Sequence, residues 1–229
     1  MPDYRRILWE GRRWILIAVL LFLAGALFGL IASLAWPDEV MRQLQPFVGQ
    51  LREVGERVAA EGSPLARTSI IFRNNGMALL WMLLLGLVPF PVFGFWPAAG
   101  TFGNGFLVGI VLGLGTRFTP LAASPSMIVL ATLPHGIIEL PALWIGAAWG
   151  MKLGLAWLLP SAAGHRLRVL GQSALEAGQI FVLVSLMLVV AAAIEANVTL
   201  SLVRQFQQAQ QVQQVYLAQP SGPAAAGIL

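Results

Sequence analysis

The stretch that decides the fold is residues 74–116, which read NNGMALLWMLLLGLVPFPVFGFWPAAGTFGNGFLVGIVLGLGT and contain no Asp, Glu, Lys or Arg. As a helix of about 1.5 Å per residue, this stretch would measure roughly 65 Å. One crossing of the hydrocarbon core needs only about 20 apolar residues. Three prolines between Val88 and Ala98 mark a break, because proline removes a backbone donor and disfavours helix in the residue before it. The stretch therefore predicts two membrane spans, at about 75–88 with the preceding turn and at about 98–114.

The composition of the whole chain points the same way. Of its 229 residues, 58% are hydrophobic and only 10% are charged, against about 25% charged residues in a soluble domain. A soluble protein of this size could not cover its surface with so few charges, so a soluble enzyme, a disordered protein and a fibrous protein are excluded. Alternating ten-residue strands are also absent. The expected fold class is all-α, a polytopic transmembrane helical bundle in a lipid bilayer.

Three more apolar regions bring the expected total to about five spans. Residues 14–35 are free of charge and too long for the core of a signal peptide, which is the competing interpretation. Residues 125–159 are interrupted by prolines, and we interpret them as one Pro-broken fourth span with a re-entrant entry. Two spans in that region, six in all, is the alternative. A loop at 160–176 then leads to the last span at 177–194.

Basic residues predict the orientation of the chain. Four arginines lie within the first 13 residues, whereas only Arg42 follows the first span closely. Lys and Arg near span ends favour the cytoplasmic side. We therefore expect a multi-pass protein of the cytoplasmic (inner) membrane with a cytoplasmic N-terminus. Lys152, Arg166 and Arg168 would then also face the cytoplasm.

Outside the spans, one polar segment is long enough to form structure of its own. We expect a single transmembrane domain at 1–203, with an extracytoplasmic amphipathic segment at 37–62 and a polar, Gln-rich, disordered tail at 204–229. Apolar residues in the segment recur at helical spacing, although an internal proline predicts a kinked helix or two short ones. The segment either lies on the outer membrane surface or docks an extracytoplasmic partner. The candidate docking residues are Val40, Leu44, Leu51 and Val54.

Glycines four residues apart predict how the spans pack. Helices attract one another weakly in lipid unless their backbones approach closely, which small residues allow. The sets are Gly25/Gly29, Gly105/Gly109/Gly113 and Gly146/Gly150/Gly154. Packing within the chain is the favoured interpretation, and a homodimer through one of these faces is the alternative.

The segment 133–141, Leu-Pro-His-Gly-Ile-Ile-Glu-Leu-Pro, places His135 and Glu139 four residues apart in an apolar run. On a helix they share one face and can touch. Ionisable groups at membrane depth are costly and usually face a bundle interior or a water-filled cavity. The expectation is a structural pair or a site that handles protons or a ligand. The candidate polar site comprises Pro134, His135, Gly136, Glu139, Asn74 and Asn75.

Other chemistries find no support in the sequence. Two neighbouring ligands are too few for a metal site, so no metal or cofactor is expected. No HExxH motif, nucleophile elbow, P-loop or dinucleotide fingerprint is present, and we expect no enzyme. The net charge of +4 comes from scattered arginines, which does not predict nucleic-acid binding.

Several elements together resemble the stage II sporulation protein M family, in order and spacing from about Arg12 to about Asn197. They are Ser63-Pro64, Ile71-Phe72-Arg73-Asn74-Asn75, Gly103-Asn104-Gly105-Phe106-Leu107-Val108-Gly109 and the segment 133–141. The resemblance implies a membrane-embedded, non-enzymatic partner of peptidoglycan hydrolases that drive septal thinning and engulfment of the forespore. We accordingly expect a membrane scaffold for a peptidoglycan-degrading complex in that or a related envelope process. The alternative is a transporter or lipid-handling protein that uses His135 and Glu139.

Overall fold

The computed structural model of the chain describes residues 2–89, 92–118 and 125–199, together with positions 201, 202, 205 and 208. Within these residues the fold is all-α, as predicted, and contains no strand. The α-helices are α1 (Tyr4–Ala35), α2 (Pro37–Ala60), α3 (Pro64–Leu85), α4 (Phe95–Phe118), α5 (Pro125–Leu155) and α6 (Arg166–Ile194). The short 3-10 segments η1 (Ala156–Leu158) and η2 (Pro160–Ala162) join α5 to α6, and the π-helical segment η3 (Glu195–Thr199) continues α6. Most of the predicted tail lies outside the described residues.

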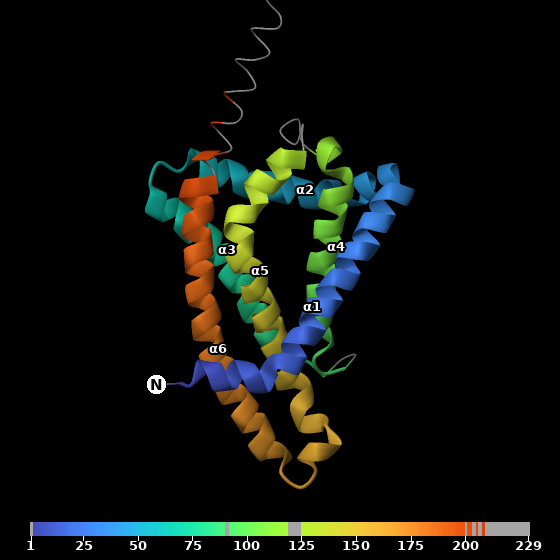
Figure 1. Cartoon of the computed structure of the whole chain (residues 1–229), viewed down its shortest axis with the longest axis vertical. Helices are drawn as coiled ribbons and strands as arrows, with labels where there is room; N and C mark the ends of the chain where they lie inside the picture. The colour runs from blue at the N-terminus through green and yellow to red at the C-terminus, as the bar shows by residue number, and fades with distance from the viewer. Residues whose placement is uncertain are drawn as a thin grey trace, which may run out of the picture.

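Four helices are long and apolar enough to cross a membrane: α1, α3, residues Phe95–Gly115 of α4, and α6 with η3. Their outer sides carry large apolar residues such as Leu27, Leu112 and Leu186, each more than half exposed. Surfaces of this kind are typical of contact with lipid. Figure 1 shows α5 running beside α3 and α6, from the end that α2 crosses to the opposite end that holds η1 and η2. A fifth crossing by α5 remains a prediction.

Two boundaries differ from the sequence prediction. The predicted break in the fourth span is wrong as a break in the helix, because α5 is one helix from Pro125 to Leu155 with Pro134 and Pro141 inside it. Neighbouring helices in a bundle can re-satisfy the backbone groups that proline leaves unpaired. The predicted loop at 160–176 is also wrong beyond its first residues, since α6 already begins at Arg166. The charged residues at 166–176 lie outside the apolar run, but they are part of the same helix.

The segment after the first span forms one helix, α2, with Pro46 inside it. Figure 1 shows α2 crossing the end of the bundle rather than running along it. Its last turns are anchored, because Val58 is buried and Val54 packs beside it against Ile71 and Ala192. Ser63 is the N-cap of the next helix, α3, since its side chain accepts a hydrogen bond from the Ala66 N–H.

The closest helix contact joins α1 to α4 through glycines on both helices. A Cβ atom on Gly25 or Gly29 would clash with the carbonyl oxygen of Phe102 or Phe106. Conversely, a Cβ atom on Gly105 would clash with the Phe22 carbonyl oxygen of α1. Backbone therefore lies directly against backbone, and these two glycine sets pack within the chain as the favoured interpretation predicts.

The third glycine set joins α5 to α3. Gly150 lies against the Met82 carbonyl and Gly154 against the Gly86 carbonyl. The same helix also packs against α6, and Trp149 of α5 and Ile180 of α6 are fully buried in the main apolar core.

An ion pair joins the end of α5 to the first part of α6. Lys152 of α5 donates to Glu176 of α6, and the Trp149 Nε1–H donates to the same carboxylate at 3.3 Å. The two charged side chains are 15% and 24% exposed. The Trp149 ring also lies against Gly11, so the first turns of α1 dock on this pair.

The glycine contact yields a first prediction. Gly105→Ala should lower the free energy of unfolding by about 1–3 kcal/mol, because the new methyl group meets the α1 backbone, which has to move. Gly103→Ala on the same helix is the matched control, since its Cβ would meet nothing within 4 Å. There the gain in helix propensity should stabilise the protein by up to about 1 kcal/mol. Tryptophan-monitored unfolding in detergent measures both, and equal destabilisation by the two variants would contradict the packing described.

Candidate functional site

The centre of the site is the pair that the sequence places on one face of α5. His135 Nε2 lies 3.8 Å from Glu139 Oε2, and the two side chains are 14% and 21% exposed. The prediction that these residues meet is therefore confirmed. Of the neighbouring residues in the candidate set, Gly136 is buried and Pro134 is partly buried.

A second predicted element joins the pair from α3. The Asn75 Nδ2 group donates a hydrogen bond of 3.0 Å to Glu139 Oε1. Asn74 in turn donates to Asn75 Oδ1 at 3.4 Å, although Asn74 itself is exposed. The structure thus connects two polar elements that lie 64 residues apart in the sequence. Asn104 of α4 does not join this cluster, and its side chain donates instead to the Gly100 carbonyl of its own helix.

The sequence analysis missed two members of the site, both in η3. Thr199 is buried, and its Oγ1 atom lies 3.4 Å from His135 Nδ1. Glu195 places a carboxylate oxygen near the pair, so that one atom each from His135, Glu139 and Glu195 lie within 4.8 Å of one another. The only sequence signal was a carboxylate at the end of an apolar run with a hydroxyl four residues later.

The cluster contains more acidic than basic groups. Glu139 and Glu195 bring two carboxylates together, and in the described part of the chain no Lys or Arg forms an ion pair with either. Half-buried carboxylates in an apolar bundle are costly unless a proton or a cation compensates their charge. His135 supplies one titratable nitrogen for this purpose. The cluster can therefore hold protons or offer three ligand atoms to a cation.

The predicted docking residues differ in how far the rest of the protein covers them. Val40 and Leu44 are half-buried on α2, whereas Val54 packs against the anchored end of that helix. The Leu51 side chain lies outside the described residues. A docking role for this set stays a prediction.

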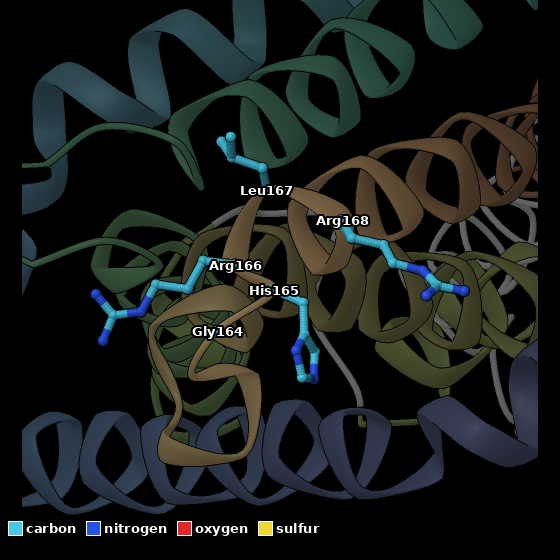
Figure 2. A pocket seen from close by; sticks show the side chains of 5 residues that line it. All are labelled: Gly164, His165, Arg166, Leu167 and Arg168. Carbon is cyan, nitrogen blue, oxygen red and sulfur yellow. The ribbon is translucent and has the colours of Figure 1, made fainter.

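Two surface hollows lie away from the polar pair. One of about 300 Å³ is lined by Gly164, His165, Arg166, Leu167 and Arg168 at the start of α6. Figure 2 shows that the side chains of Arg166 and Arg168 point away from each other, so no charges converge there. The other, of about 360 Å³, is lined by Val54, Arg57, Ile70, Arg73, Asn74 and Met77, between α2 and α3. Neither is lined by His135 or Glu139.

The model of the family described as Stage II sporulation protein M matches residues 18–200. The chain belongs to the stage II sporulation protein M family. The match includes the α1–α4 contact and every residue of the polar cluster. It confirms the resemblance inferred from the sequence motifs. Neither the search of curated proteins nor the search of solved structures found a similar protein.

The link between α3 and α5 yields a second prediction. Asn75→Ala should destabilise the protein by about 1–3 kcal/mol, because it leaves a half-buried carboxylate without its hydrogen-bond donor. Asn104→Ala is the matched control and should have little effect, since Asn104 bonds only to its own helix. Thermal unfolding in detergent tests both substitutions. An Asn104→Ala effect as large as that of Asn75→Ala would contradict the assigned role.

Proposed function

We propose that this member of the stage II sporulation protein M family is a non-enzymatic membrane scaffold. It holds peptidoglycan-degrading enzymes at the outer face of the cytoplasmic membrane, for septal thinning and engulfment or a related envelope process. The observation that carries the proposal is the family match over residues 18–200. The position of α2 supports it, because a helix across one end of the bundle can meet a partner without disturbing the spans (Figure 1).

The orientation proposed from the sequence puts α2 on the side where peptidoglycan lies. The arginine-rich start of the chain faces the cytoplasm. Since α2 follows α1 directly, it then lies at the opposite, extracytoplasmic end. The η1 and η2 turns and the first turn of α6, which contains Arg166 and Arg168, lie at the end away from α2 (Figure 1).

The first half of α2 is the proposed docking element. Its last turns are held by Val58 against α3 and α6, whereas Val40 and Leu44 are only half-buried and Phe47 is 37% exposed. Exposed Glu39–Arg42 and Glu53–Arg57 pairs cover the polar side. A half-covered apolar strip with a polar rim is typical of protein interfaces.

Site-specific crosslinking tests the scaffold. A photo-crosslinking amino acid at Leu44, introduced in native cells, should capture proteins that carry peptidoglycan-hydrolase domains. The same group at Leu167, which is 86% exposed near η2, is the control and should not capture them. Mass spectrometry identifies the products. Capture of lipid alone at position 44, or equal capture of hydrolases at both positions, would refute the assignment.

A second candidate function is transport or lipid handling through the polar cluster. The observation that favours it is the gathering of His135, Glu139 and Glu195 inside the bundle, which is where transporters place ionisable residues. Such a protein has to open the site to water during its cycle.

Cysteine accessibility tests this candidate, because the chain contains no Cys. Thr199→Cys, at a position only 5% exposed in the structure, should then react with a water-soluble thiol reagent. Ser33→Cys, 1% exposed and packed against Gly113 of α4, is the matched hydroxyl-to-thiol control and should stay protected. If neither cysteine reacted with the reagent, the transport or lipid-handling function would be refuted.

A further inference from the structure

The geometry points to a binding site for one divalent transition-metal ion, formed by His135 and Glu139 of α5 and Glu195 of η3. One ligand atom from each residue lies within 4.8 Å of the other two. Two ligand atoms on one tetrahedrally coordinated ion, each at about 2.0–2.2 Å from it, lie about 3.3–3.6 Å apart. The three ligand atoms therefore have to approach one another by about 1 Å to bind one ion, a movement that side-chain rotations can supply. This inference is independent of the scaffold proposal.

The third ligand comes from an irregular part of α6. The helix changes to π-helical geometry at Glu195–Thr199, and both ends of that segment reach the same pair on α5. Single π turns inside α-helices occur frequently at functional sites. From the sequence alone, only His135 and Glu139 are close enough to share an ion, which is too few ligands for a metal site. The fold brings Glu195 to them as the third ligand.

The hydrogen bonds around the cluster leave the ligand atoms free. With a proton on Nδ1, His135 donates to Thr199 Oγ1, and its Nε2 lone pair faces Glu139 Oε2 at 3.8 Å. Asn75 donates to the other Glu139 oxygen, Oε1. Metal-binding histidines usually donate their second N–H to a neighbouring group, and ligating carboxylates are themselves hydrogen-bonded. The cluster has both features.

The donor set selects the class of ion. One imidazole nitrogen with two carboxylates suits first-row divalent ions such as Zn²⁺ or Mn²⁺. Ca²⁺ and Mg²⁺ prefer sites made of oxygen alone. An ion of charge +2 also compensates the two carboxylates, which no Lys or Arg pairs within the described part of the chain.

Zinc titration of the full-length protein tests the site. The protein carries no polyhistidine tag, is stripped with chelator in detergent and is titrated with Zn²⁺ by calorimetry. Wild-type protein should bind one Zn²⁺ per chain, with no competition from excess Mg²⁺. His135→Gln and Glu195→Gln should weaken binding by about 100-fold or more, and Thr199→Ala, which keeps all three ligands, by about 10- to 100-fold.

Matched controls separate the site from surface binding. His165→Gln replaces the other histidine of the chain, which is exposed, and Glu53→Gln replaces an exposed glutamate of α2. Both should bind Zn²⁺ like wild type. Absence of stoichiometric binding in the wild type, or equal losses in His135→Gln and His165→Gln, would overturn the inference. If His135→Gln fails to fold, unchanged affinity in Thr199→Ala together with Glu195→Gln would also overturn it.

Discussion

The contact on which the structure depends is the one between the backbones of α1 and α4. The Phe102 and Phe106 carbonyls occupy the space that a side chain at position 25 or 29 would need. In lipid, no water-driven force pulls helices together, so close van der Waals approach decides which helices pair. In the second group of helices, α5 packs against α3 and α6. That second group of helices supplies every residue of the polar cluster, with η3 as the continuation of α6.

Features that depend on residues close together in the sequence could be predicted, whereas features that depend on how two helices meet could not. The spans and the pairing of His135 with Glu139 depend on helical periodicity, which a sequence displays directly. The glycine spacing likewise showed which helix faces would pack closely. Glu195 and Thr199 could not be placed, because their direction depends on how far α6 is rotated about its axis where it meets α5. The π turn that sets this rotation has no clear signal in the sequence.

The two wrong boundaries share one physical cause. Proline breaks helices and charge ends membrane segments when a helix is considered alone. In this bundle, α5 continues through Pro134 and Pro141 while neighbouring helices pack along it. At the other end, α6 begins at Arg166, ten residues before Glu176 meets Lys152, so the charged residues there lie within the helix. Rules that consider one helix alone therefore misplace both boundaries.

The proposed scaffold role alone does not explain why two carboxylates, those of Glu139 and Glu195, lie together with no Lys or Arg pairing either of them in the described part of the chain. A scaffold needs rigid packing, and apolar residues of similar volume would pack at least as stably as a half-buried ionic cluster. Asn75, Thr199 and the π turn of η3 instead hold His135, Glu139 and Glu195 in position with their ligand atoms facing one another. A bound divalent ion would turn this electrostatic cost into a cross-link between α5 and the end of α6. Because α2 is anchored through Val58 on Ala192 and Ala196 of that same end, the ion would also stiffen the surface on which α2 rests.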